Sequence, residues 1–267
     1  EICACLVGSE MCIRDRYTAC TGMVHQMNRL DVVTNNMANS DTTAYKKEGS
    51  TSQSFDSVYG IKINDSSVNY IHQNIGRMSL GVKVGETYTD YGDGNLEETE
   101  QLYDMALSGK GFFAISYADR NGNESVRYTR DGNFTVNSQG VLVTKDGDFV
   151  LAEDGGLINI PEGVKISVDE SGRITADGQE IAQLQLVDFE DYNYLEKFGE
   201  NMYIAIDGAT TKDAQCKVYQ GYLEASNVNV VTEMVDMITI TRDYESNQKV
   251  IQTIDSTLEK SVALGRI

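Results

Sequence analysis

Residues 229–264 read NVVTEMVDMITITRDYESNQKVIQTIDSTLEKSVAL, and the spacing of their apolar side chains decides the fold. Steps of four and three residues connect ten positions, of which seven are apolar. These positions are Val230, Met234, Met237, Thr241, Tyr244, Gln248, Ile251, Asp255, Leu258 and Val262. Side chains at such steps share one face of an α-helix. The stretch therefore predicts a helix of about 50 Å, at a rise of about 1.5 Å per residue.

A second helical pattern lies near the other end of the chain, from Thr18 to about Asn39. Apolar residues recur there at steps of three and four: Cys20, Met23, Met27, Leu30, Val33 and Met37. Isolated helices are marginally stable in water, and long apolar stripes are buried when two helices pack against each other. We therefore expect the terminal helices to pair. A two-helix pair leaves apolar surface over, which favours assembly with further copies.

The middle of the chain has a different character. Residues 49–74 are rich in Ser, Asn and Gln and predict an extended connector. From about 82 to 222, short apolar runs alternate with Gly, Asp and Asn, a pattern typical of an all-β domain. Strands are expected at 112–115, 125–129, 141–143, 149–151, 158–160, 165–168, 172–175 and 181–189.

Together these patterns predict an α+β protein. Its long N- and C-terminal helices pair as a coiled-coil-like stem, and a central all-β domain lies between them in the sequence. The expected boundaries are 17–45 for the N-terminal helix, 46–81 for the connector, 82–224 for the β domain and 225–267 for the C-terminal helix.

Residues 1–16 do not fit the rest of the chain. Positions 5–16, CLVGSEMCIRDR, resemble the translated read-through of a sequencing adaptor, so we expect this segment to be non-native. It contains three of the five cysteines. The other two, Cys20 and Cys216, lie far apart, and neither a disulfide framework nor a metal-binding spacing is present. We expect both to be ordinary buried side chains.

The composition excludes several classes of function. The chain has 22 Lys+Arg against 41 Asp+Glu, a formal net charge of −19. Nucleic acid and anionic lipid both require a basic face, so we expect neither as a partner. No run approaches the ~18 apolar residues that indicate a membrane span, and no secretory signal is visible.

Candidate catalytic and metal-binding motifs are weak. The two histidines, His25 and His72, have no cysteine or acid at a metal-binding or triad spacing. Residues 119–124 resemble the start of a calcium loop, but the glycine and the glutamate that such a loop requires are missing. We therefore expect a hairpin turn at 119–124, and a protein that is not an enzyme and has no cofactor, no metal and no small-molecule substrate.

Two further charged or glycine-rich motifs have ordinary structural explanations. The run Gly109-Lys110-Gly111 lacks the spacing of a phosphate loop and is expected to form a tight turn before the next strand. The acidic side chains of Glu97, Glu98, Glu100 and Asp104 are expected on a solvated face.

Three groups of residues carry a resemblance to a known family. Near the N-terminus NNMAN at 35–39 is followed by TTAYK at 42–46, where Ala44 replaces the glycine of the family pattern. In the middle are ALSGKGFF at 106–113 and YTRDGNF at 128–134. QGYLEASNVNVV at 220–231 then leads into the C-terminal helix. Over residues 17–267 the sequence resembles the bacterial flagellar basal-body rod and hook family.

The resemblance implies a structural role and several properties of the family. Its members stack into a hollow, torque-transmitting helical homopolymer, with the terminal helices lining an inner tube and the β domain outside. They contact other rod and hook proteins, leave the cell through the flagellar type III export apparatus without a cleaved signal, and lie in the basal body within the cell envelope. Within the family the resemblance is strongest to a distal rod subunit, with a proximal rod subunit a close second. A glycine with positive φ at the position of Ala44 would make alanine there cost about 1 kcal/mol.

We expect the subunit interface to involve fourteen side chains on or beside the terminal helices. For the four polar residues at 35–42, capping of the helix end is an equal alternative. The expected interface residues are Met23, Met27, Leu30, Asn35, Asn36, Asn39, Thr42, Tyr45, Met234, Met237, Ile238, Tyr244, Ile251 and Leu258.

Two other functions are weighed against the rod subunit. A β-rich surface adhesin or binding module would place its function on the β loops and make the terminal helices dispensable. A hydrolase that acts on the cell wall would need paired carboxylates or a nucleophile motif, and neither stands out in the sequence.

Overall fold

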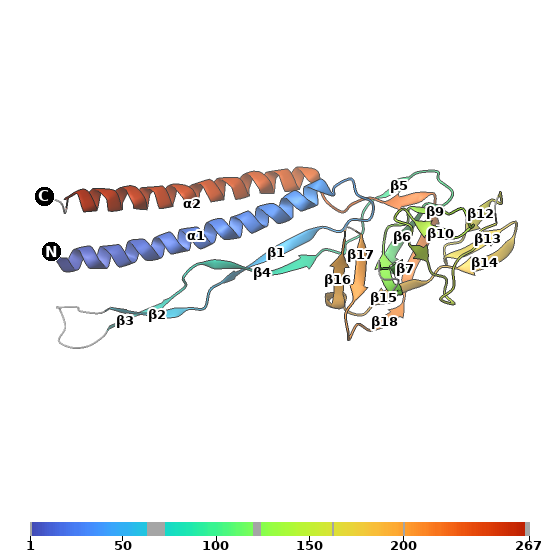
Figure 1. Ribbon diagram of the computed structural model, residues 1–267, viewed down its shortest axis with the longest axis horizontal. Coiled ribbons are helices and arrows are strands. Elements are labelled where there is room, and N and C mark those ends of the chain that lie inside the picture. Colours follow the sequence, from blue (N-terminus) through green and yellow to red (C-terminus); the bar gives the residue numbers. More distant parts are fainter. Residues whose placement is uncertain (1, 63–72, 120–123, 162, 200, 265–267) are drawn as a thin grey trace. The chain divides into compact units, whose positions relative to one another are not determined.

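The computed structural model describes residues 2–62, 73–119, 124–161, 163–199 and 201–264 (Figure 1). The chain divides into two compact units. The stem unit comprises Glu1–Ala38, Glu48–Asp90 and Asn229–Ile267, and the β unit comprises Asn39–Lys47 and Tyr91–Val228. Helices therefore come from both ends of the sequence, and strands dominate the middle, which makes the protein α+β as expected.

The stem unit contains both long helices, α1 (Ile2–Ala38) and α2 (Val230–Leu264). Helix α1 starts well before the predicted Thr18, because the segment expected to be non-native continues the same helix. It ends at Ala38, before the predicted boundary at residue 45. Helix α2 starts at a capping residue, since the side-chain oxygen of Asn229 accepts hydrogen bonds from the N–H groups of Val231 and Thr232, at 3.1 and 3.2 Å.

The stretch expected to be an extended connector contains paired strands, which the sequence pattern does not predict. The stem unit contains β1 (Glu48–Ser54), β2 (Val58–Lys62), β3 (Gln73–Met78) and β4 (Val82–Thr89). β1 pairs antiparallel with β4, and β2 pairs antiparallel with β3. The side chains of β1 are mostly polar and exposed, so no apolar alternation marks the strand in the sequence.

The β unit consists of short antiparallel strands. Its largest sheet has the order β16-β17-β8-β7-β11-β10-β9, and β15 pairs with both β7 and β18. Smaller sheets are β12-β13-β14, β19-β6 and β20-β5. The strands are β5 (Leu96–Glu98), β6 (Met105–Lys110), β7 (Phe112–Ala118), β8 (Glu124–Thr129), β9 (Phe134–Val136), β10 (Leu142–Thr144), β11 (Phe149–Val150), β12 (Ile166–Val168), β13 (Arg173–Ala176), β14 (Gln179–Gln183), β15 (Leu186–Phe189), β16 (Leu195–Phe198), β17 (Met202–Ala205), β18 (Thr211–Asp213), β19 (Gln215–Gln220) and β20 (Tyr222–Glu224).

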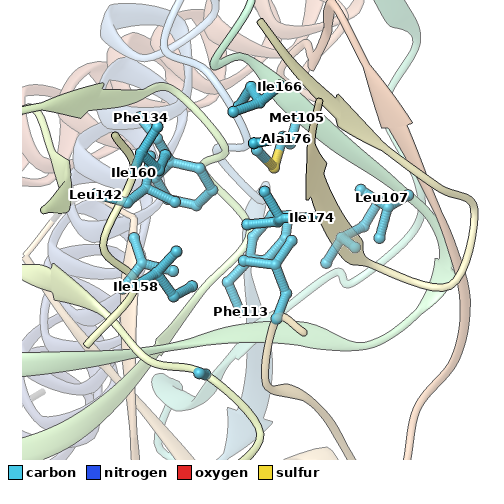
Figure 2. Close-up of a cluster of buried hydrophobic side chains, with 14 residues drawn as sticks. Met105, Leu107, Phe113, Phe134, Leu142, Ile158, Ile160, Ile166, Ile174 and Ala176 are labelled. Atoms are coloured by element: carbon cyan, nitrogen blue, oxygen red, sulfur yellow. The ribbon is translucent and has the colours of Figure 1, made fainter. Parts of the chain in front are cut away.

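The core of the β unit is a contiguous cluster of aliphatic and aromatic side chains (Figure 2). Phe113 and Phe134 pack edge to face with ring centroids 5.1 Å apart, a geometry that aromatic pairs prefer. Around them lie buried side chains from several strands and from the bridge region at 158–160, including Met105, Leu107, Leu142, Ile158, Ile160, Ile166 and Ile174. The alternation of apolar residues that predicted these strands is the pattern that fills this core.

Most strands expected from the sequence are confirmed, with two exceptions. The run 181–189 is not one strand but parts of β14 and β15, separated at residues 184–185. Residues 158–160 form only an isolated bridge, between Asn159 and Val141. The expected hairpin turn at 119–124 falls mostly outside the described residues. The solvated face is confirmed for Glu97, Glu98 and Glu100 and wrong for Asp104, which is buried and accepts a 2.6 Å hydrogen bond from the Thr99 hydroxyl.

Ala44 has the left-handed backbone that the family's glycine would adopt easily. Its φ is +56°, its side chain is buried, and its N–H donates a 2.7 Å hydrogen bond to the carbonyl of Glu224. The surrounding contacts therefore hold an alanine in a conformation that its Cβ disfavours.

We expect Ala44→Gly to raise the free energy of unfolding by about 1 kcal/mol, because glycine adopts positive φ without strain. Urea denaturation followed by tyrosine fluorescence measures the change. The control is Ala114→Gly in strand β7, where the same deletion of a buried methyl relieves no strain and should lower the stability. A loss of stability in both variants would contradict the prediction.

Candidate subunit interface

The two helices of the stem unit run antiparallel along each other (Figure 1). Three hydrogen bonds between side chains of the two helices define which residues of α1 lie beside which residues of α2. The carboxylate of Asp255 accepts a hydrogen bond from Arg16, that of Asp243 accepts one from Gln26 at 3.3 Å, and that of Glu233 accepts one from Asn36 at 3.4 Å. As the residue number rises along α1, the number of the facing residue on α2 therefore falls.

The buried face of α2 differs from the predicted stripe at every second position. Met237, Tyr244, Ile251 and Leu258 are half-buried, as the stripe requires. Between them, the less exposed positions are Ile240, Asn247 and Ile254, whereas the predicted Thr241, Gln248 and Asp255 are exposed. The predicted and the observed stripes both alternate steps of three and four residues, so they have the same helical period. Where they differ, the observed residue precedes the predicted one by one position, which rotates the side chain by about 100° around the helix axis.

The α1 side chains singled out from the sequence lie on different faces. Met23 and Leu30 are half-buried, Val33 is buried, and Met27 is exposed. Cys20 is also exposed, so the expectation that it is buried is wrong, and Cys216 is half-buried. Close packing against α2 is provided instead by Gly22, since a Cβ there would lie 3.1 Å from the Asn247 side-chain nitrogen.

The buried amide of Asn36 joins three elements of the stem unit. Its nitrogen donates a 2.8 Å hydrogen bond to the carbonyl of Glu48, and its oxygen accepts a 2.9 Å bond from the N–H of the same residue. The same nitrogen also contacts Glu233 of α2. Asn36 thus holds Glu48, the first residue of β1, beside α1, and this contact lies within one chain. The neighbouring Asn35 is exposed.

The remaining predicted residues beyond α1 lie in the β unit. The side chains of Asn39 and Thr42 bond each other at 3.2 Å, and the N–H of Thr42 donates to the carbonyl of Asn39 at 3.4 Å. These bonds form a turn directly after α1, and capping of the helix end by these side chains stays a prediction. Tyr45 is buried. Within one chain Asn36, Asn39, Thr42 and Tyr45 therefore make internal contacts, and an interface role for them stays a prediction.

Helix α2 carries a group of apolar side chains that remain about half exposed or more. Val231, Met234, Val235 and Ile238 are 71, 48, 57 and 54% exposed, and we call them the α2 patch. Their spacing of i, i+3, i+4 and i+7 places them on one face. One turn further along, the same face carries the exposed charged residues Arg242, Glu245 and Lys249. Met234 and Ile238 are among the interface residues predicted from the sequence, whereas Val231 and Val235 are not, although they lie at the same helical spacing.

His25 is buried on α1 against the strand β1. One of its ring nitrogens lies 2.8 Å from the Ser52 hydroxyl. Burial, together with the nearby Arg29, lowers the pKa of this imidazole below its usual value of 6.5. The folded protein therefore favours the neutral ring and binds fewer protons here than the unfolded chain does. His72 lies outside the described residues.

The stability of the stem unit should fall as the pH drops through about 6.5, because the unfolded chain then takes up a proton that the folded chain resists. Thermal unfolding followed by circular dichroism between pH ~7.5 and ~5 measures the effect. His25→Gln keeps the contact with Ser52 without a titrating ring and should flatten the dependence. If the thermal stability of His25→Gln falls equally steeply with decreasing pH, side chains other than His25 cause the pH dependence.

The described residues contain no group of three or more His, Cys, Asp or Glu side chains placed to hold a metal ion. A cavity of about 560 Å³ in the β unit is lined by residues that include Asp131, Asp148 and Asn201. Burial raises the pKa of Asp131, whose carboxylate accepts hydrogen bonds from Asn133, Thr43 and Asn201.

In the part of the chain that the structure describes, neither helix is long and apolar enough to cross a membrane.

Comparisons with known proteins match both ends and the middle of the chain. Three family models match: "Flagella basal body rod protein" at 17–46, "Flagellar hook protein FlgE/F/G D1 domain" at 106–176, and "Flagellar basal body rod FlgEFG protein C-terminal" at 219–264. The first match begins after the segment expected to be non-native, and the last covers the whole of α2.

Curated relatives are similar over nearly the whole length of the chain. The flagellar basal-body rod protein FlgG of Buchnera aphidicola subsp. Schizaphis graminum is 33% identical, over 90% of this chain and 95% of the relative. FlgG of Caulobacter vibrioides is 34% identical, over 92% of this chain and 97% of the relative. The rod protein FlgF of the same organism is also 34% identical, over 90% and 93%.

Proposed function

This chain belongs to the flagellar basal-body rod protein family and is a structural subunit of the rod; we propose that it joins the rod by burying its α2 patch against other copies of itself. The observation that carries the proposal is the exposure of Val231, Met234, Val235 and Ile238 on one helix face. Contiguous exposed apolar side chains mark interaction sites. The occupant is a second copy because the family's printed name is that of a rod protein, and its models match residues 17–38 of α1 and all of α2.

The magnitudes favour a polymer with several neighbours per subunit over a dimer. Complete burial of one such side chain contributes about 1.5–3 kcal/mol, and the four are already about half-buried, so the α2 patch supplies roughly 4 kcal/mol. Association costs an estimated 4–15 kcal/mol in lost translational and rotational freedom. One patch is therefore too weak to hold two chains together, and the free chain stays monomeric until several contacts form at once.

We extend the proposal to the arrangement and partners of the subunit in the rod. The paired helices line an inner channel in coiled-coil-like contact, and the β unit lies outside, so that the polymer is a hollow shaft that transmits torque. Other rod and hook proteins contact its ends. The chain reaches the envelope through the flagellar type III export apparatus without a cleaved signal. The match of both terminal segments to the family models supports this arrangement.

Deletion of 232–267 tests the proposal against the β-rich adhesin. The deletion removes most of α2 and leaves every strand of the β unit in place. We expect the shortened chain to be absent from basal bodies purified from a strain that lacks the full-length chain, although its β unit still gives a cooperative unfolding transition. An adhesin would keep its binding because its loops remain. Incorporation of the shortened chain into rods would contradict the proposal.

A further inference from the structure

The residues that follow α1 are built into the β unit. The hydroxyl of Thr43 donates a hydrogen bond to the carboxylate of Asp131. Tyr45 and Lys46 are both buried, and the ammonium of Lys197 lies 3.9 Å from the centre of the Tyr45 ring. The chain therefore leaves α1 and enters the interior of the other unit within a few residues.

The residues that precede α2 lie beside this segment. The N–H of Ala44 donates a 2.7 Å hydrogen bond to the carbonyl of Glu224, and the N–H of Asn227 donates a 3.3 Å bond to the carbonyl of Tyr45. The N–H of Lys47 donates a 2.7 Å bond to the side-chain oxygen of Asn227. The segments 44–47 and 224–227 thus lie side by side, run in the same direction and are bonded to each other directly.

A buried charge cluster joins the same two segments. Lys46 and Glu224, whose side chains are each 1% exposed, form an ion pair with 2.6 Å between Nζ and Oε1. Arg130 reaches that oxygen at 3.2 Å and the carboxylate of Asp93 at 2.8 Å. The N–H of Gly94 donates a further 2.8 Å bond to Glu224. The cluster holds two cations and two anions, so its charges balance.

Such a cluster contributes specificity of pairing more than stability. Removing two charges from water costs about as much as their attraction returns, so a pair of apolar side chains would stabilise the fold at least as well. The Lys46 ammonium, however, reaches the Glu224 carboxylate in only one alignment of the two segments. The cluster therefore fixes which residue after α1 lies beside which residue before α2.

We propose that Lys46, Arg130 and Glu224 form a clamp that fastens the chain segments leading to α1 and α2 to each other inside the β unit. A force applied to either helix is then borne by both segments together. Without the clamp, the stretched segment would separate from its neighbour by breaking a few single hydrogen bonds one after another. The load-bearing role rests on the proposed function as a rod subunit, whereas the clamp itself is a property of one chain.

Hydrogen exchange of the full-length monomer tests the clamp. Lys46→Met removes one cation and keeps the bulk of the side chain. We expect the amides of Ala44, Lys47 and Asn227 to exchange at least about tenfold faster in this variant. The core amide of Leu142, which is bonded to Ile158 at 3.0 Å, should exchange unchanged.

A matched control breaks an ion pair of nearly equal length elsewhere in the β unit. Lys217→Met removes the 2.7 Å pair with Glu170, in which both side chains are more than half exposed, and should change none of these amides. Unchanged exchange at Ala44 in Lys46→Met, or an equal acceleration at Leu142, would overturn the clamp. If Lys46→Met does not fold, Glu224→Gln carries the same test, because it removes the shared anion and keeps the shape of the side chain. The readout is again the Ala44 amide, whose acceptor is the backbone carbonyl of residue 224 and is untouched.

Swimming in media of increasing viscosity tests the load-bearing role. Cells that produce the Lys46→Met chain should assemble rods, because the α2 patch is intact, but should stop swimming at a viscosity that Lys217→Met cells tolerate. Equal swimming of both strains at every viscosity would overturn the load-bearing role. Failure of the wild-type chain to enter rods would instead contradict the proposed function, while the exchange result for the monomer would stand.

Discussion

Met234→Asp combined with Ile238→Asp should abolish rod formation and leave the folded monomer intact. Both side chains are about half exposed in the single chain, and substitutions at such positions usually change stability by less than about 0.5 kcal/mol each. In an assembled rod the same positions would bury two carboxylates against apolar neighbours, which costs several kcal/mol per unpaired charge. Motility, the yield of basal bodies with complete rods, and circular dichroism of the purified chain measure both effects.

The matched control places the same two charges elsewhere on the helix. Gln248→Asp combined with Gln252→Asp introduces two aspartates, also four residues apart, at exposed positions outside the α2 patch. It should leave rods and swimming normal. Normal rods in the double variant would show that the α2 patch is not an interface, and loss of rods in both strains would point to the added charge itself.

Gly132→Ala should unfold the β unit or lower its free energy of unfolding by about 4 kcal/mol or more, among the largest effects of a single substitution. A Cβ at this position would lie 1.5 Å from the carbonyl oxygen of Met105. The strand backbone itself must therefore move. Met105 is fully buried in the core, and its N–H bonds the carbonyl of Gly132 at 3.0 Å. Urea denaturation followed by tyrosine fluorescence measures the loss.

Gly156→Ala is the control for this substitution. A Cβ there meets nothing within 4 Å, and the backbone is not left-handed, so the same change of residue should cost less than about 1 kcal/mol. A Gly132→Ala chain that is as stable as the control would contradict the close approach of residues 105 and 132.

The sequence predicts the elements of this protein better than it predicts their contacts. The helical period of α2 is plain, but Ile240 and Thr241 both fit it, and only packing against α1 selects the isoleucine. Strand β7 was found because Phe112 and Phe113 are apolar and lead into a turn. Strand β1 was missed because its exposed polar side chains carry no alternation, and its backbone pairing with β4 alone makes it a strand.

The candidate interface could be predicted only in part, for a related reason. The sequence indicates that the two paired helices carry more apolar surface than they can bury against each other. The exposure of Met234 and Ile238 follows from this surplus. The internal roles of Asn36 and Tyr45 depend on the backbone of residues distant in sequence, Glu48 for the first and Asn227 for the second. No local pattern encodes such contacts. The left-handed Ala44 is an exception, since its replacement of the family's glycine marked the position in advance.

Electron cryomicroscopy of basal bodies purified from cells that produce this chain tests directly whether the α2 patch is buried between subunits. We expect helices of neighbouring copies to cover the face formed by Val231, Met234, Val235 and Ile238. A rod in which this face stays uncovered, with subunits joined only through their β units, would contradict this expectation.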